Sequence, residues 1–140
     1  GDCVVFFNRD LGKEFEYRCK QAGQLASKMR FLAAPWVGLL TDDVWVRNAR
    51  HANAMASKLA QGLQQLGVRI AAPVESNAIF ADFTSEQTNV LRKIGWIFYE
   101  FSGVGTARLM CSWKTTGAEI ERLLADCESI VTPLAQAQDD

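Results

Sequence analysis

Residues 107–113 have the sequence ARLMCSW, which places one arginine inside a short apolar run with the composition of a β-strand. A guanidinium in such a run loses contact with water, and an anion must offset that loss. Arg108 is therefore a candidate for binding a carboxylate. An internal ion pair with a nearby acid, such as Glu119 or Glu121, meets the same requirement, and this stretch alone leaves both interpretations open.

Around this stretch, the second half of the chain predicts a small antiparallel sheet with helices on one face, an α+β arrangement. Strand composition recurs in residues 68–72, 78–83 and 96–101, and the first two segments are expected to be antiparallel neighbours. Gly103 and Gly105 permit the turn into the strand that carries Arg108.

Two helices are expected to accompany this sheet. A short one begins at Ser85-Glu86, and Thr116 caps the last one, with Glu119 in its first turns. The apolar stripe of the last helix comprises Ile120, Leu123, Leu124 and Cys127.

The first half of the chain predicts three helices. Asp10 can cap the first, and the second runs from Gln24 to Leu40 with a kink at Pro35. The third helix is expected to begin at the capping sequence Thr41-Asp42-Asp43 and to end at Gly67. Its apolar stripe comprises Trp45, Ala49, Ala52, Met55, Leu59, Leu63 and Leu66.

Residues 3–7, CVVFF, are apolar at consecutive positions, which is typical of a strand covered on both faces. Such a strand needs neighbours that the rest of the pattern does not supply. We therefore expect a fragment that starts on a central strand of a larger sheet. An ordinary first strand of a small α+β domain is the alternative.

Composition excludes several classes of protein. The 140 residues include 15 basic and 16 acidic ones, a balance that predicts neither a nucleic-acid surface nor a membrane surface as partner. The four cysteines form no CxxC pair and the one histidine, His51, falls on a largely polar helix face, so no metal site is expected. Free thiols and the lack of an apolar run of about 18 residues favour a cytoplasmic protein.

Basic side chains gather in the connection between the first two predicted helices. Lys20, Lys28 and Arg30 lie there beside Gly23, and a helix start of this kind can hold a phosphate or a carboxylate. Solvated lysines at a helix break are the alternative. No serine or threonine has a histidine or lysine placed to activate it as a nucleophile. No catalytic residue is therefore expected in this chain.

Five segments of the chain resemble the C-terminal portion of low-specificity L-threonine aldolases and the similar phenylserine aldolases. They are residues 1–7, 15–32, 45–56, 74–80 and 108–113, and the likeness extends over roughly residues 1–130. The run from Lys20 to Phe31 is the most specific of them. The resemblance explains the unusual beginning as a strand of a large domain, with the missing N-terminal large domain as a partner.

The resemblance implies a pyridoxal-phosphate enzyme of fold type I, a beta-eliminating lyase relative that cleaves β-hydroxy-α-amino acids to glycine and an aldehyde. Residues 1–40 would form the end of the large-domain sheet and its connecting helices, and residues 41–140 the small C-terminal α+β domain. The Schiff-base lysine of that family has no counterpart in these 140 residues, so the piece alone is expected to be inactive.

The resemblance also assigns roles to individual residues. Arg108 matches the arginine that binds the substrate carboxylate, and Lys20, Lys28 and Arg30 match a connection that approaches the cofactor or substrate, in one subunit or in its neighbour in a homo-oligomer. Two alternatives remain: a free-standing α+β binding or assembly module without catalysis, and another fold-type I enzyme such as an aminotransferase.

Overall fold

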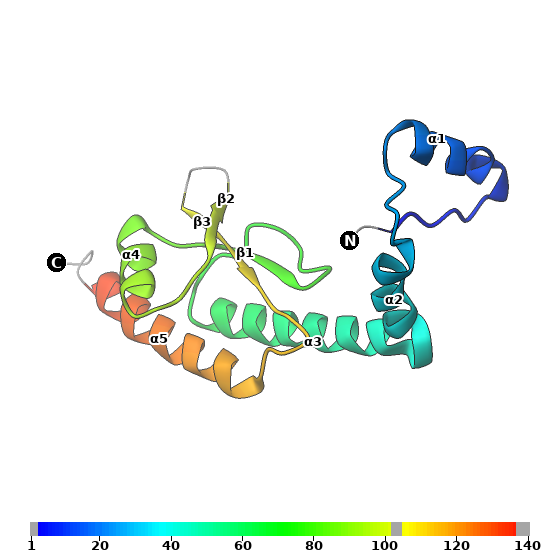
Figure 1. Ribbon diagram of the computed structural model, residues 1–140. Coiled ribbons are helices and arrows are strands. Elements are labelled where there is room, and N and C mark those ends of the chain that lie inside the picture. The colour runs from blue at the N-terminus through cyan, green and yellow to red at the C-terminus, as the bar shows by residue number, and fades with distance from the viewer. Residues whose placement is uncertain (1–2, 102–104, 137–140) are drawn as a thin grey trace. The chain divides into compact units, whose positions relative to one another are not determined.

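The computed structural model of this chain describes residues 3–101 and 105–136 and divides into two units, Gly1–Trp45 and Val46–Asp140 (Figure 1). The second unit contains the sheet that the sequence predicts. Its strands are β1 (Ala78–Asp82), β2 (Tyr99–Phe101) and β3 (Thr106–Met110), in the antiparallel order β1-β3-β2.

One face of this sheet is buried and the other is not. Ile79 pairs with Leu109 and Ala81 with Ala107, and all four side chains are buried. Their neighbours along the strands point to the opposite face, because side chains alternate along a strand. The second unit therefore has a two-layer construction in which a single sheet face supplies the core.

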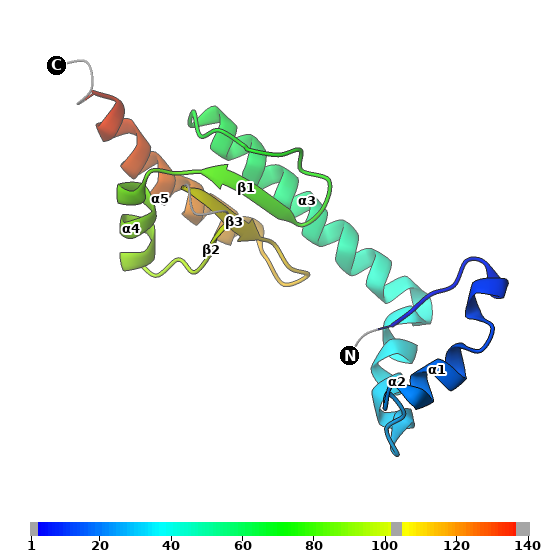
Figure 2. The same cartoon turned by 90° about the horizontal axis from the view of Figure 1, so that it is seen from above.

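Helices cover the buried face. The helices that pack there are α3 (Val44–Gln65) and α5 (Gly117–Gln136), which lie on the same side of the sheet, as Figures 1 and 2 show. Their buried residues are Ala52, Ala56, Leu59, Ala60, Leu63, Ile120, Leu123 and Cys127. The predicted stripe of α5 is confirmed, and that of α3 is confirmed from Ala52 onward, whereas Trp45 is 52% exposed.

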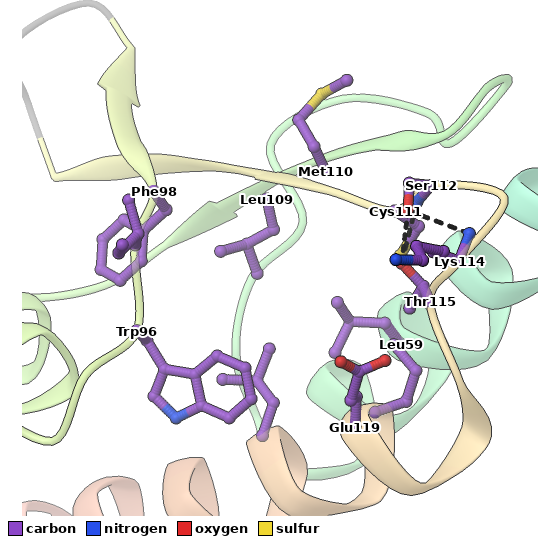
Figure 3. A pocket seen from close by; sticks show the side chains of 13 residues that line it. Leu59, Trp96, Phe98, Leu109, Met110, Cys111, Ser112, Lys114, Thr115 and Glu119 are labelled. Carbon is purple, nitrogen blue, oxygen red and sulfur yellow. Dashed lines mark hydrogen bonds between the residues drawn. The ribbon is translucent and has the colours of Figure 1, made fainter.

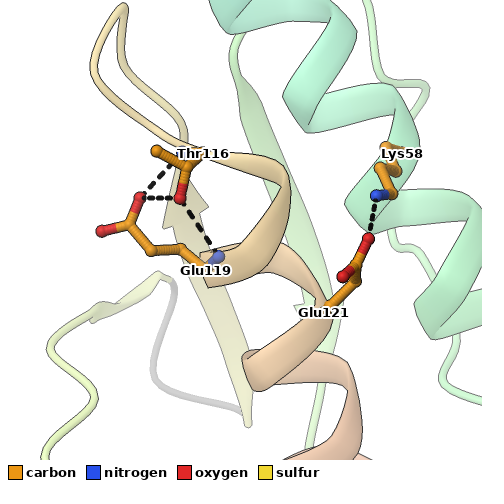
Figure 4. A network of polar contacts seen from close by, with 4 residues as sticks. All are labelled: Lys58, Thr116, Glu119 and Glu121. Carbon is orange, nitrogen blue, oxygen red and sulfur yellow. Dashed lines mark hydrogen bonds and ion pairs between the residues drawn. The ribbon is translucent and has the colours of Figure 1, made fainter.

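Capping boxes fix the starts of the last two helices. Thr84 caps α4 (Ser85–Lys93) and exchanges hydrogen bonds with Gln87. Thr116 caps α5 in the same way: its hydroxyl accepts from the Glu119 amide, and its amide and hydroxyl donate to Glu119 Oε2 at 2.7 and 2.9 Å (Figure 4). Both predicted helix starts are thus confirmed to within a residue.

Two predicted strands are shorter than expected. Only Ile70 of residues 68–72 forms a bridge, with Ala81, because Pro73 follows closely and has no amide hydrogen to extend the ladder. Regular pairing in residues 96–101 begins at Tyr99. Gly103 of the predicted turn lies outside the described residues, whereas Gly105 adopts a φ of +69°.

The first unit contains four short helical elements and no buried residue between positions 3 and 45. These elements are η1 (Arg9–Gly12), α1 (Phe15–Gln21), α2 (Met29–Leu40) and η2 (Thr41–Asp43). Asn8 rather than Asp10 caps η1, and α2 begins at Met29 rather than Gln24.

Thr41 does not cap the third helix as predicted. Its hydroxyl instead donates to the carbonyl of Val37 at 2.7 Å, a bond to the preceding turn that serine and threonine make readily. Asp42 then takes a left-handed conformation with φ 52°, and regular α-helix resumes only at Val44.

The apolar segment Cys3–Phe7 is not a strand in this structure, contrary to the prediction. Val4, Val5 and Phe7 are 60%, 64% and 98% exposed, and no strand among the described residues pairs with the segment. A β-strand is stabilised by hydrogen bonds to a neighbour and by burial of its faces, and this segment has neither here.

Gly105 should tolerate no side chain. A Cβ at this position would lie 2.6 Å from the carbonyl oxygen of Phe83, and its φ is already left-handed. We expect Gly105→Ala to cost roughly 3 kcal/mol or more in the free energy of unfolding, measured by urea titration.

Gly67→Ala is the matched control. Gly67 has a φ of +80° but nothing within 4 Å of an added Cβ. The free energy of unfolding should therefore fall only by the strain of a left-handed alanine, about 1 to 2 kcal/mol. Equal losses at Gly67 and Gly105 would contradict the steric explanation.

Candidate functional site

Arg108 lies on the open face of the sheet. It stands between the buried Ala107 and Leu109 in β3, so its side chain points away from the core. The register places Phe80 opposite it on β1 and Tyr99 opposite it on β2. Arg108 is half-buried and Tyr99 is 77% exposed, so Arg108 has an aromatic residue opposite it on each neighbouring strand and remains within reach of solvent.

The guanidinium of Arg108 makes one hydrogen bond, from Nε to the sulfur of Met110 at 3.3 Å, and no ion pair within the described part of the chain. The two acids considered as internal partners are engaged elsewhere. Glu119 accepts from Thr116, and Glu121 pairs with Lys58 Nζ at 2.7 Å (Figure 4). The internal ion pair is therefore not present, and the forked Nη groups of Arg108 are left for another anion.

A second polar group occupies the same sheet face. Asp82 accepts a hydrogen bond from the Thr106 hydroxyl at 2.6 Å and pairs with Arg69. These contacts, the Thr106 bond above all, hold the pKa of the Asp82 carboxyl below its ordinary value of 3.8, against the opposing effect of burial. Because Asp82 has its own partners, it does not compete for Arg108.

The basic residues of the first unit lie at exposed positions on two helices. Lys20 is in the last turn of α1, Lys28 is the N-terminal capping residue of α2, and Arg30 is in the first turn of α2. Arg30 stands over the ring of Phe31, 5.0 Å from its centre. Only Lys28 lies in the connection between α1 and α2, while Lys20 and Arg30 lie in the helix ends on either side of it. Arg108 belongs to the other unit.

A pocket of about 230 Å³ opens on the helix-covered side of the sheet. Trp96 and Phe98 form one side of it, and Ser112, Lys114 and Thr115 stand across from them (Figure 3). Its remaining lining comes from α3, α5, β3 and the segments before β2 and after β3, namely Leu59, Ile97, Leu109, Met110, Cys111, Glu119, Ile120 and Leu123. Arg108 is not among the lining residues.

The only histidine of the sequence, His51, is exposed, as expected, and its Nε2 lies 2.7 Å from the carbonyl oxygen of Thr115. Within the described residues, no three His, Cys, Asp or Glu side chains are grouped as a metal site requires. No helix in that part of the chain has the length and apolar composition needed to cross a membrane.

With this geometry established, comparison with known proteins identifies the family. The model of the family described as "Beta-eliminating lyase" matches residues 2–86. The chain belongs to the beta-eliminating lyase family. The matched residues include the connection that carries Lys20, Lys28 and Arg30.

Relatives within this family confirm the resemblance noted from the sequence. A low specificity L-threonine aldolase from a Pseudomonas species is 50% identical over 133 residues, and one from Pseudomonas aeruginosa is 51% identical over 132. Both alignments cover 94% of this chain. The chain spans only 38% of the length of either relative.

A solved structure of a threonine aldolase from Leishmania major is similar in fold. It is 27% identical to this beta-eliminating lyase chain, with a TM-score of 0.80 over 90% of the chain and 38% of the other protein. This match supports the α+β fold expected from the sequence, because the chain is similar in structure to one part of a threonine aldolase.

Sequence patterns did not reveal the pocket, because its lining comes from segments far apart in the chain. They also missed how Asn77 holds the end of β3. The Asn77 side chain donates to the carbonyl of Cys111 at 2.7 Å, and the Cys111 amide donates back to the Asn77 carbonyl at 2.9 Å. An asparagine between two strand segments predicts only a turn residue, so the sequence does not show that Asn77 anchors the end of β3.

Asp82 gives a pH-dependent prediction. A carboxyl with a lowered pKa in the folded state stabilises the fold above its ordinary pKa, and that contribution is lost as pH falls through the folded value. Thr106→Val should lower the free energy of unfolding by about 1 kcal/mol at pH 7. The difference in this free energy between variant and parent should shrink as pH falls below 3.8.

The control for this prediction is Thr88→Val. The Thr88 hydroxyl donates to the backbone carbonyl of Ser85 at 3.0 Å, a group that does not titrate, so its cost should not vary with pH. Urea titrations at several pH values measure both differences. A Thr106→Val cost that stays constant with pH would show that Asp82 is not the partner that matters.

Proposed function

We propose that the complete protein is a pyridoxal-phosphate lyase that cleaves β-hydroxy-α-amino acids of the threonine type to glycine and an aldehyde. In this proposal, Arg108 binds the carboxylate of the substrate. The observation that supports this role most directly is that the guanidinium on the open sheet face pairs with no acid among the described residues, which leaves it available to an external anion. The similar relatives named threonine aldolases support the class of reaction.

The surroundings of Arg108 suit recognition of a carboxylate. The Met110 sulfur accepts the Nε hydrogen, which leaves the two Nη groups to form a forked pair with a carboxylate. Phe80 and Tyr99 flank Arg108 in the sheet register, and aromatic residues on the neighbouring strands reduce the screening of a charge pair by water. Binding the carboxylate in this way orients the α-carbon for reaction.

The cofactor, when bound, supplies an electron sink for the carbanion left on the α-carbon after the bond to the β-carbon breaks. Lys20, Lys28 and Arg30 fit its phosphate, since they are exposed cations at the end of α1 and the start of α2 and form no ion pair with a described residue. No residue of the described first unit is buried, so these cations can supply contacts but not an enclosed site.

Several features of the complete protein belong to the same proposal. It would be a cytoplasmic homo-oligomer in which a large domain supplies the lysine that holds the cofactor, with residues 41–140 as the small C-terminal domain of a fold-type I enzyme. The second candidate is an α+β binding module without catalysis. Its support is the second unit, which has its own sheet, helices and core.

Arg108→Lys in the complete protein tests the carboxylate role. A lysine keeps the charge but cannot form the forked pair, so kcat/KM for threonine should fall about 10- to 100-fold. Arg92→Lys is the matched control, because Arg92 already pairs with Glu100 at 3.0 Å. Its kinetics should match those of the parent. An unchanged kcat/KM in Arg108→Lys would remove Arg108 from substrate binding.

A separate experiment tests the cofactor. The complete protein should show a visible absorption band that disappears on treatment with borohydride, and it should release glycine from threonine. A colourless protein without glycine release would favour the binding module over the lyase.

A further inference from the structure

The pocket on the helix-covered side of the sheet has the properties of a preformed binding site. Four apolar side chains that line it are nearly inaccessible to solvent: Leu59 is 2% exposed, Leu109 6%, Ile120 3% and Leu123 7%. They come from three different elements of the second unit, so the shape of the pocket is fixed by the core itself. Arg108, on the opposite sheet face, takes no part in it.

Polar contacts outside the pocket hold its aromatic wall in place. The indole Nε1 of Trp96 donates to Asp126 Oδ2 at 2.8 Å, and the guanidinium of Arg122 stands 4.7 Å from the centre of the Trp96 ring. The Arg92 guanidinium stands 5.1 Å from the ring centre of Phe98. Rings fixed in this way lose little freedom when a ligand packs against them, which favours binding.

The size of the pocket limits the occupant. A cavity of about 150 Å³ in another protein accommodates benzene. The present pocket of about 230 Å³ therefore has room for one aromatic ring with a short substituent. A ring between Trp96, Phe98 and Leu109 would meet apolar and aromatic surfaces on several sides (Figure 3).

The polar side of the pocket carries a cation, Lys114, that has no anionic partner in the described part of the chain. The Lys114 ammonium lies 5.9 Å from the centre of the Trp113 ring and makes no ion pair with any residue that the structure describes. The neighbouring polar groups are occupied: Thr115 Oγ1 accepts from the Ser112 amide at 2.8 Å, and Ser112 Oγ accepts from the Lys114 amide at 3.1 Å.

Glu119 also lines the pocket, and its charge is partly offset. Its Oε2 accepts from both the amide and the hydroxyl of Thr116, contacts that lower the pKa of the Glu119 carboxyl. Glu119 Oε2 is thus engaged in capping α5, whereas the Lys114 ammonium has no ionic partner among the described residues. Lys114 is therefore the group at this side of the pocket that can pair with an anionic ligand.

We propose that this pocket binds a small one-ring carboxylate, with its ring against Trp96 and Phe98 and its carboxylate at Lys114. Arg108 does not line this site, although Met110 is common to both, and the inference does not depend on the proposed aldolase activity. Because Trp96 forms a wall, ligand binding should change its fluorescence.

Three probes of equal length test the inference on the full chain: 3-phenylpropanoate, 3-phenylpropanol and 3-phenylpropylamine. Titration followed by tryptophan fluorescence and by calorimetry should show saturable binding of the carboxylate, about three- to tenfold tighter than the alcohol, with the amine weakest. Trp96→Phe should remove the fluorescence change while calorimetric binding persists.

Two exposed variants locate the site without disturbing the core. Lys114→Gln should abolish the preference for carboxylate over alcohol and leave alcohol binding unchanged, whereas Lys93→Gln, at an exposed lysine outside the pocket, should behave as the parent. Ile97, which is 95% exposed and lines the pocket, provides a second test: Ile97→Glu should weaken carboxylate binding and spare the alcohol.

Several outcomes would overturn the inference. They are the absence of saturable binding up to about 10 mM probe, equal affinity for all three probes, or a carboxylate preference that survives Lys114→Gln. Loss of binding in Arg108→Lys together with retention in Lys114→Gln would place the ligand at the open sheet face instead. Aldolase activity is measured separately, so failure of either proposal is recognised independently.

Discussion

Burial of a single sheet face is the constraint on which the second unit depends. The side chains that pack against α3 and α5 are those of Ile79, Ala81, Ala107 and Leu109. Because side chains alternate along a strand, the residues between them must point to the open face. Arg108 must stand on the open face. Its availability to an anion follows from the same burial that stabilises the sheet, so the core and the candidate site cannot be varied independently.

The first unit shows the opposite situation. Its helices present many apolar side chains, including Phe31, Leu32 and Val37 at 54–64% exposure, yet none of its described residues is buried. Apolar surface that is not removed from water contributes nothing to stability. The local conformations of this unit are therefore determined by short-range features, such as the cap at Asn8 and the positive φ of Gly23, rather than by a core.

Sequence patterns predicted the second unit better than the first for this physical reason. The stripe of α5, the stripe of α3 from Ala52 onward and the cap at Thr116 are confirmed, because periodic burial and local capping leave direct traces in the sequence. The strand expected at Cys3–Phe7 is wrong for this structure, since strand formation depends on a pairing partner that composition does not reveal. The single arginine in the apolar run 107–113 identified the candidate residue, but the ion pair of Glu121 with Lys58 and the pocket beside Lys114 depend on contacts between distant segments.

The contact between His51 and Thr115 has a consequence for the chemistry of the imidazole. A carbonyl oxygen can only accept a hydrogen bond, so Nε2 of His51 must carry a hydrogen whether the ring is neutral or charged. In the neutral ring, the lone pair is then confined to Nδ1. The single imidazole of this sequence thus has one fixed tautomer, and an electrophile or a metal ion can approach it from the Nδ1 edge alone.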